Sequence, residues 1–417
     1  MIGRKRVSAV ALGATVLAAC TGGDAASPVT TAPAVTTTTI VQERTSDGRL
    51  TLGVLLPTAE TSLREPLESA VNEAVDRIND AGGVLDRPVS VVFEDEGGTA
   101  ATASAAVDAL LSSNVDAIIG PSSSSAALST LAAITAAEVL SCSPTASALA
   151  LDDFPDEELF FRTIPSDSLQ AEAIAEYAAE SGFSTAAIVH VDDAYGRPFA
   201  EAVEASLASR AISVTDSISF DSNQEPRAAA EALARSDARV AILLANGADG
   251  VSFLAALDTL PVGTSLNTIV ANDALRDPAG AQRIAALAPE LRESIVGIAP
   301  EAVPANSGSP YDPPGPYAAN AFDCVNLIAL SAERVQSDNP REMAGQMAAV
   351  SSSGSDCRTF AECADALRAG LRIDYDGPSG VTDLSVARGD PSRARFDVFA
   401  FDNAGRDAVI GTLIAAR

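Results

Sequence analysis

The sequence contains one lysine, one histidine and no tryptophan in 417 residues. Because Lys5 is the only lysine, the chain has none placed to serve a phosphate-loop NTPase, a protein kinase or a pyridoxal enzyme. A Ser-His-Asp hydrolase would depend on His190, and a zinc site would lack imidazole ligands. We therefore expect a protein that is not an enzyme, has no catalytic residues, and uses no metal and no cofactor.

Positive charge is scarce along the chain. There are 27 arginines and lysines against 56 acidic residues, which gives a formal net charge of −29. A surface this acidic repels nucleic acids and anionic membrane surfaces, so we expect neither as a direct partner. With 47% apolar residues, the chain is long enough to build two domains with cores of their own.

The first twenty residues have the order of parts found in a secretion signal. A basic stretch at 4–6 precedes an apolar run at 7–18 that is too short for a permanent transmembrane helix. The run ends in "LAAC", which resembles a bacterial lipoprotein lipobox and implies cleavage before Cys20 and lipidation of its sulfur. We expect a signal peptide over 1–19 and a flexible Thr- and Pro-rich tether over 20–48. An ordinary signal peptide with an unrelated cysteine is the alternative.

Four cysteines remain once Cys20 is assigned to the lipid, and an extracytoplasmic location allows them to form disulfides. Three pairings are possible. Cys357 and Cys363 lie six residues apart and favour a local bridge, which leaves Cys142 and Cys324 for each other. The alternative for Cys142 and Cys324 is a pair of buried free thiols.

From Leu50 onward, short apolar runs alternate with segments of helical period. Runs that are apolar throughout are typical of parallel strands covered on both faces, which predicts an α/β fold. The number of strand–helix units exceeds one sheet, so we expect two α/β lobes. The clearest predicted strands are 50–56, 88–94, 115–119, 139–143, 185–191, 212–219, 239–245 and 266–271, and the clearest predicted helices are 65–80, 99–113, 168–181, 196–210, 225–236, 248–259 and 318–335.

Four serines, Ser122 to Ser125, follow a predicted strand that ends at Gly120-Pro121. They could cap the next helix, form an anion site with its N-terminal N–H groups, or supply a nucleophile. A nucleophile is disfavoured, because "GPSSSSA" departs from the Gly-x-Ser-x-Gly elbow and the base would have to be His190. The cap and the anion site both stay open on these residues alone.

Several stretches occur in an order that is typical of one family: "AVDRINDAGGVLDRPVSVVFEDE", "VDAIIGPSSSSAA", "SPTAS", "FRTIPSDSLQAEAIAEYA", "VANDALRDPA" and "DYDGPSG". Together they resemble the substrate-binding proteins of branched-chain amino acid ABC transporters, which are type I periplasmic binding proteins of the leucine/isoleucine/valine kind. The resemblance covers the chain after the tether and implies two Rossmann-like lobes, joined by three crossovers, that close on a ligand. It places lobe I at 48–165 and 292–345 and lobe II at 166–291 and 346–417.

The resemblance also implies where the ligand binds. Ser124 matches the serine that holds the α-carboxylate of the ligand at the start of a helix. Thr145 and Ser147 would lie across from it, facing the ammonium and the carboxylate. Asp273 matches the acid that holds the ammonium, and Tyr195 matches an aromatic wall beside the ligand. The alternatives are that the serines and Asp273 only cap helices, and that Tyr195 is buried between helix and sheet.

Other positions depart from the family pattern. Leu63, in "PTAETSLREP", replaces part of a glycine-rich loop at a position expected to touch the ligand side chain. Arg64 beside it could face an acidic ligand or solvent. Asn246 takes the place of an aromatic ligand contact, and Phe322 stands where the family often has tyrosine. These departures leave the ligand's side chain more open than its amino-acid head.

The resemblance implies a binding protein that hands an amino acid, of branched-chain type or an analogue, to an ABC transporter permease. We expect a monomeric lipoprotein on the outer face of a bacterial cell membrane, attached only through its lipid anchor. A ligand-sensing receptor module of the same fold is the alternative, and it would bind an amide, a urea-like compound or another small acid. No apolar run of membrane-spanning length follows Cys20, which counts against a receptor with its own transmembrane helix.

Overall fold

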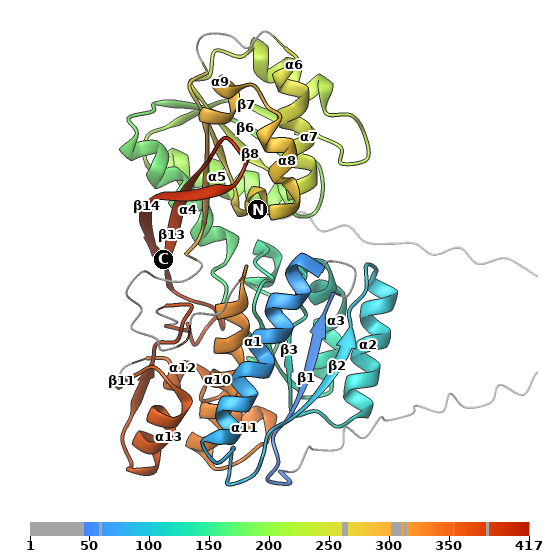
Figure 1. The fold of residues 1–417 in the computed structure, drawn as a ribbon, viewed down its shortest axis with the longest axis vertical. Helices are drawn as coiled ribbons and strands as arrows, with labels where there is room; N and C mark the ends of the chain where they lie inside the picture. Colours follow the sequence, from blue (N-terminus) through green and yellow to red (C-terminus); the bar gives the residue numbers. More distant parts are fainter. Residues whose placement is uncertain are drawn as a thin grey trace, which may run out of the picture. The chain divides into compact units, whose positions relative to one another are not determined.

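The computed structural model describes residues 46–57, 61–260, 266–301, 311, 315–352, 354–380 and 383–416, apart from the side chains at positions 61 and 62. The predicted signal peptide, Cys20 and nearly all of the tether lie outside these residues. Within them, helices surround two large sheets, which confirms the α/β fold (Figure 1). No helix in the described ranges is both long enough and apolar enough to cross a bilayer.

Lobe I is built on a five-stranded parallel sheet with the order β2-β1-β3-β4-β5. Its elements are β1 (Thr51–Leu56), α1 (Thr61–Asp80), β2 (Ser90–Asp95), α2 (Ala100–Ser112), β3 (Ala117–Ile119), α3 (Ser124–Ala136), β4 (Leu140–Ser143), the 3-10 turn η1 (Leu149–Leu151), β5 (Phe160–Arg162) and α10 (Ala318–Val335). Helices cover both faces: Leu52 and Val54 pack with α1 and α10, whereas Leu55 packs with α2 and α3. The central strand is therefore apolar on both sides, as its sequence predicts.

Lobe II is built on a seven-stranded sheet with the order β14-β13-β10-β9-β8-β6-β7. Its elements are α4 (Asp167–Glu180), β6 (Thr185–Val191), α5 (Gly196–Ser209), β7 (Ser213–Phe220), α6 (Arg227–Arg235), β8 (Val240–Leu244), α7 (Gly247–Asp258), β9 (Thr268–Ala271), the 3-10 turns η2 (Asp273–Arg276) and η3 (Pro278–Gly280), α8 (Ala281–Ala285), α9 (Pro289–Glu293), β10 (Ile295–Pro300), β13 (Arg393–Phe401) and β14 (Asp407–Ala416). The strands from β7 to β10 pair in parallel, whereas β13 runs antiparallel to β10 and to β14. The β13–β14 hairpin is the red end of the chain in Figure 1.

The segment between α10 and the last crossover completes lobe I, which corrects two predicted lobe boundaries. Its elements are α11 (Pro340–Ala344), α12 (Met347–Val350), β11 (Ser355–Cys357), α13 (Phe360–Arg368) and β12 (Ile373–Tyr375). Their apolar side chains pack in the same core as β1 and α10, so 346–384 belongs to lobe I and not to lobe II. Conversely, β10 pairs with β9, so 292–300 belongs to lobe II and not to lobe I.

The chain passes between the two lobes three times, after β5, after β10 and before β13. This matches the number of crossovers that the family resemblance implies.

Both predicted disulfides are present in the described part of the chain. Cys142 in β4 is bonded to Cys324 in α10, with Cα atoms 5.7 Å apart, and Cys357 is bonded to Cys363 across 5.4 Å. All four residues are buried. The first bridge ties the sheet of lobe I to the helix that covers it, whereas the second closes a local turn before α13.

Candidate functional site

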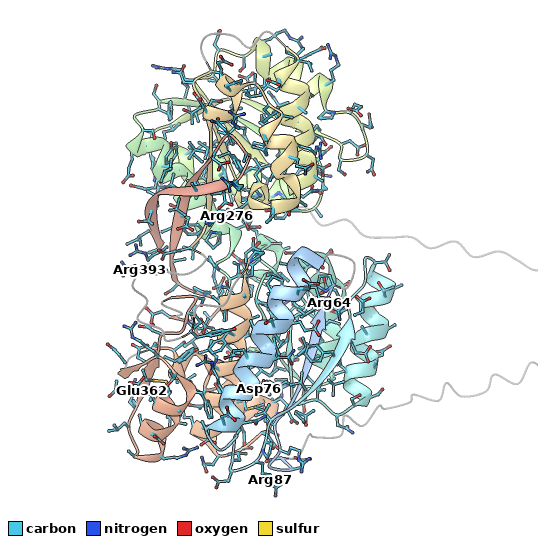
Figure 2. All side chains as sticks on the ribbon, viewed as in Figure 1. Arg64, Asp76, Arg87, Arg276, Glu362 and Arg393 are labelled. Carbon is cyan, nitrogen blue, oxygen red and sulfur yellow. A yellow bond between two sulfur atoms is a disulfide. The ribbon has the colours of Figure 1, made fainter. Side chains whose placement is uncertain are left out.

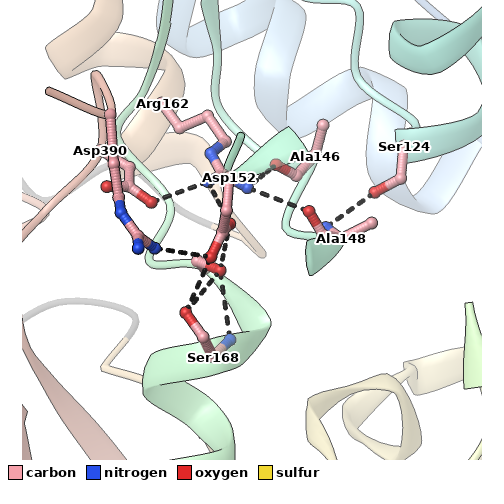
Figure 3. Close-up of polar contacts among 9 residues, drawn as sticks. Ser124, Ala146, Ala148, Asp152, Arg162, Ser168 and Asp390 are labelled. Carbon is pink, nitrogen blue, oxygen red and sulfur yellow. Dashed lines mark hydrogen bonds and ion pairs between the residues drawn. The ribbon is translucent and has the colours of Figure 1, made fainter. Parts of the chain in front are cut away.

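The serine run lies where the sequence predicts it, between the end of β3 and the start of α3. Gly120 has a φ of 115° there, and a Cβ at this position would lie 2.5 Å from the carbonyl oxygen of Leu55, so only glycine fits. Ser123 caps α3 by accepting a hydrogen bond from the N–H of Ala126 at 3.2 Å. Ser124 is partly exposed, and its Oγ accepts a hydrogen bond from the N–H of Ala148 at 3.2 Å (Figure 3).

Glu96 occupies the start of α3, and sequence reasoning missed it. Its carboxylate accepts hydrogen bonds from the N–H groups of Ser122 at 2.8 Å and Ser123 at 3.1 Å. Burial raises the pKa of the Glu96 carboxyl above its ordinary value, and the hydrogen bonds from both serines oppose this shift. A carboxylate of the protein itself therefore already takes the N–H groups of Ser122 and Ser123 in the serine run.

The loop after β4 brings Thr145 and Ser147 alongside the serine run. The Thr145 hydroxyl donates to the carbonyl oxygen of Ser122. The carbonyl oxygen of Ser147 accepts a hydrogen bond from the N–H of Asp167 at 2.9 Å, and the Ser147 side chain hydrogen-bonds to the Asp167 carboxyl. This loop thus links the serine run of lobe I to the first residue of α4 in lobe II.

Arg162 supports this loop from the interior. Its guanidinium donates to the carbonyl oxygens of Ala146 and Ala148, both at 3.4 Å (Figure 3). It is fully buried and pairs with Asp152 at 2.8 Å and with Asp390 at 2.7 Å. Because Asp390 belongs to the last crossover, one side chain connects the candidate ligand loop to the region between the lobes.

Asp273 begins η2 directly after β9, as the sequence predicts for an acid at the end of a lobe II strand. Its Oδ1 accepts a hydrogen bond from Gln170 Nε2 at 3.0 Å, and its Oδ2 accepts one from the Tyr317 hydroxyl at 2.8 Å. Gln170 lies on α4, whereas Tyr317 immediately precedes α10 of lobe I. Asp273 is therefore held from both lobes, and its side chain remains partly exposed.

Asp167 faces Asp273 across this site and is a second acid that sequence reasoning missed. Its side chain is 1% exposed, and its Oδ2 has no hydrogen-bond partner among the described residues. Burial raises the pKa of the Asp167 carboxyl from 3.8 to about 7, and the charge of Asp273 acts in the same direction. A buried carboxylate that has one unpartnered oxygen and lies near a second carboxylate is a favourable position for a cation.

Tyr195, which the resemblance implies as an aromatic wall beside the ligand, lies near the two acids. Its hydroxyl accepts a hydrogen bond from Asn272 Nδ2 at 3.2 Å, and its ring packs edge-on against Phe199. Burial raises the pKa of the Tyr195 hydroxyl well above its ordinary value, with the charges of Asp167 and Asp273 adding to the shift. We name Ser147, Asp167, Tyr195, Asp273 and Tyr317 the polar cluster.

The structure brings together Ser124, Thr145, Ser147, Tyr195 and Asp273 of the predicted ligand residues, but it places two others differently. Asn246 is exposed and caps α7 by accepting a hydrogen bond from the N–H of Asp249 at 2.9 Å. Leu63 is partly buried against the core of lobe I. Among the described residues, no hydrogen bond or ion pair joins either of them to the polar cluster, and the ligand roles of all seven residues stay predictions.

A separate cavity of about 170 Å³ lies at the crossovers. Its lining includes Thr163, Pro300, Glu301, Arg393 and Arg395, and none of the residues that line it belongs to the polar cluster. Among the described residues, no group of three or more His, Cys, Asp or Glu side chains is arranged to hold a metal ion.

Two α/β lobes with three crossovers, and a polar cluster built from both, define a two-lobed ligand-binding protein of the type I periplasmic kind. The comparison with family models agrees: residues 66–404 match the receptor family ligand binding region. The chain belongs to this family.

The relatives include binding proteins from bacteria and an archaeon. The chain is 28% identical, over 81% of its length and 84% of the relative, to the chemotactic signal transduction system substrate-binding protein BasB of Halobacterium salinarum. It is 26% identical, over 38% of its length and 44% of the relative, to Leu/Ile/Val-binding protein homolog 3 of Brucella melitensis. The crystal structure of the branched-chain amino acid transporter substrate-binding protein LivJ from Streptococcus pneumoniae, in complex with isoleucine, has the same fold, with a TM-score of 0.68 and 18% identity over 88% of this chain and all of that one.

Proposed function

We propose that this protein captures an amino acid or a close analogue between its two lobes and delivers it to an ABC transporter permease. The ammonium of the ligand would bind Asp167 and Asp273, and Tyr195 would pack beside it. One observation carries this proposal: a buried carboxylate with one oxygen left unpartnered, Asp167 Oδ2, lies near a second carboxylate, Asp273, that is held from both lobes. The proposal assigns binding to this site and no catalytic step.

The family and the relatives support the proposal. Their names describe Leu/Ile/Val-binding and substrate-binding proteins, and LivJ was crystallised with isoleucine. A ligand that touches both lobes stabilises the state in which they meet, because its contacts there exceed those it makes with either lobe alone. Attachment to the outer face of the membrane through a lipid on Cys20, with no other membrane segment, completes the proposed role.

Thermal unfolding of the purified full-length chain in the presence of single amino acids and analogues tests this function. A bound ligand at a hundred times its dissociation constant should raise the free energy of unfolding by about 2.7 kcal/mol. Asp273→Asn should weaken binding by roughly 30-fold or more, because it removes one of the two charges that face the ammonium.

The matched control for this experiment is Asp221→Asn, which removes an exposed carboxylate from a turn outside the polar cluster. It should bind ligand as the wild type does. If no amino acid or analogue raises the unfolding temperature, or if Asp273→Asn binds as tightly as the wild type, the assignment of this site is wrong.

Sensing without transport is the second candidate function, and the relation to a chemotactic substrate-binding protein favours it. In that case the ligand could be an amide, a urea-like compound or another small acid. Uptake of labelled ligand by cells lacking this protein distinguishes the two functions. Transport requires that uptake fall in those cells, whereas sensing requires unchanged uptake and the loss of a behavioural or transcriptional response.

A further inference from the structure

The cavity of about 170 Å³ at the crossovers is lined by all three segments that join the lobes. Thr163 and Pro165 come from the first crossover, Pro300 and Glu301 from the second, and Pro391 from the third. Residues of α10, of the loop after β12, and of β13 and β14 complete the lining. Since a water molecule takes up about 30 Å³, the cavity has room for about five or six waters, or for one small organic molecule.

Much of the cavity wall is apolar. Three proline rings line it, one from each crossover, together with Ala394 and Ile414. Ile414, on β14, is 48% exposed although its side chain is entirely apolar. A molecule with an apolar body would cover part of this surface and remove it from water, which is favourable.

The uncharged polar side chains in the lining already have partners within the protein. The Thr163 hydroxyl donates to the carbonyl oxygen of Asn320 at 2.9 Å, and Asn320 Nδ2 donates to the carbonyl oxygen of Thr163 at 3.0 Å. The Ser379 hydroxyl donates to the carboxylate of Asp323. These three side chains therefore close the wall, and the charged side chains decide what a ligand meets.

Two arginines and one acid, Glu301, carry the charge of the lining among the described residues. Arg395 Nε lies 2.9 Å from the Glu301 carboxylate, whereas the rest of the Arg395 guanidinium forms no hydrogen bond or ion pair with described residues. Arg393, the first residue of β13, lies next to the crossovers and forms none at all with them (Figure 2). In a chain with a net charge of −29, this wall has an excess of positive charge and of N–H donors.

The acids adjacent to the lining residues do not cancel this excess, because each has partners of its own. Asp323 accepts hydrogen bonds from Ser379 and Tyr375. Asp390, next to Pro391, pairs with Arg162, and Asp397 pairs with Arg276. The donors of Arg393 and Arg395 therefore remain available to an anion.

We propose that this cavity is a second binding site, which takes a small organic carboxylate: Arg393, with Arg395 beside it, holds the carboxylate, and the proline rings and Ile414 contact the apolar body. A guanidinium matches a carboxylate with two parallel N–H donors, which gives this pair its strength and its geometry. The inference is independent of the proposed function, because none of the residues that line the cavity belongs to the polar cluster.

NMR titration of the full-length chain at neutral pH tests the ligand class with three probes that share one branched apolar body. We expect 3-methylbutanoate to bind about tenfold or more tightly than 3-methylbutanamide, because the amide lacks the charge that pairs with Arg393. 3-Methylbutylamine, a cation, should bind more weakly than the amide at this site. Inorganic phosphate, which has the charge and no apolar body, should bind more weakly than 3-methylbutanoate.

Three variants locate the bound acid. Arg393→Gln should weaken the binding of 3-methylbutanoate about tenfold or more and bring it close to that of the amide. The matched control is Arg239→Gln, which removes an exposed arginine of lobe II outside the cavity lining and should bind the acid as the wild type does. Asp273→Asn, which changes the polar cluster, should also leave the binding of 3-methylbutanoate unchanged.

The outcomes separate this site from the polar cluster. If 3-methylbutanoate binds no more tightly than its amide, or if Arg393→Gln binds it as the wild type does, the carboxylate site is wrong. Loss of 3-methylbutanoate binding in Asp273→Asn would assign the acid to the polar cluster and would also overturn the proposal. The absence of a thermal shift with amino acids bears only on the proposed function.

Discussion

Asp167 lies where burial and a neighbouring carboxylate both oppose its negative charge. It is the first residue of α4, its side chain is almost fully buried, and Asp273 faces it. A charged group in this position destabilises the ligand-free protein and becomes favourable when a cation arrives. Under the proposed function, the ammonium of a ligand would relieve this repulsion when it binds.

Replacing Asp167 by asparagine should change how stability depends on pH. The pKa of the Asp167 carboxyl is raised from 3.8 to about 7 in the folded protein, so the folded state holds this proton more tightly than the unfolded state does. Its contribution to the free energy of unfolding is fully present below about pH 4 and is lost as pH rises toward about 7. Asparagine does not titrate, so the free energy of unfolding of the variant does not fall with pH for this reason. At about pH 8 it should exceed that of the wild type by at most about 4 kcal/mol, relative to the difference at acid pH.

Urea unfolding of wild type and Asp167→Asn at a series of pH values checks this expectation. The control is Asp153→Asn, which removes an exposed carboxylate near η1. The gap between wild type and Asp167→Asn should widen from acid to mildly alkaline pH, whereas the control should run parallel to the wild type. Parallel curves for both variants would show that Asp167 does not carry a raised pKa.

Site residues that follow a strand were predictable from sequence, whereas those held by long-range pairing were not. Ser124 and Asp273 lie where an apolar run ends, and their order along the chain matches the family. Glu96 resembles one more acid in the stretch "FEDE", because its burial comes from the N–H groups of serines 26 residues away. Asp167 looks like an ordinary acid in the first turn of a helix until Asp273 is placed beside it.

At the scale of elements, Arg162 joins three parts of the chain that no local pattern connects. It ends β5, supports the loop between β4 and η1, and pairs with Asp390 on the last crossover (Figure 3). Asp152 also accepts hydrogen bonds from Ser166 and Ser168 at the start of α4. The candidate ligand loop, the start of lobe II and the last crossover therefore share one buried ionic network.

Arg162→Met should destabilise the protein strongly, because it removes the buried cation that pairs with both Asp152 and Asp390 and leaves Asp152 the partly exposed Arg388. The expected loss in the free energy of unfolding is about 3–5 kcal/mol. The matched control is Arg406→Met, which breaks an ion pair with Asp402. The Arg406 side chain is 75% exposed, so this variant should lower the free energy of unfolding by about 1 kcal/mol or less. Chemical denaturation measures both values, and equal losses in the two variants would contradict the structural role of the network.

Elements whose apolar period is local were predictable, and elements fixed by distant pairing were placed less well. The predicted strand at 185–191 and helix at 318–335 agree with β6 and α10 at both ends. The strand β10 escaped the sequence pattern because it is specified by pairing with β9 on one side and antiparallel β13 on the other, nearly 100 residues later. Because β10 was not predicted, the return of the chain to lobe I was placed too early, at 292.

At the scale of the whole molecule, the two lobes meet at the acid expected to hold the ligand. Gln170 of lobe II and Tyr317, which precedes α10 of lobe I, each donate to one oxygen of Asp273. A ligand ammonium at this carboxylate therefore binds where both lobes already contribute.

The proposed membrane attachment depends on Cys20, which lies outside the described residues. With a net charge of −29, the chain has no electrostatic attraction to an anionic bilayer that could substitute for a lipid. Two or more acyl chains give stable anchoring, whereas one gives only reversible binding. We therefore expect that, in bacterial cells, the wild-type chain incorporates labelled palmitate and stays in the membrane fraction. The Cys20→Ser variant should incorporate no palmitate. Cys357→Ser, which removes one sulfur of a buried disulfide, should still be labelled. Label in Cys20→Ser, or its absence from the wild type, would show that Cys20 is not lipidated.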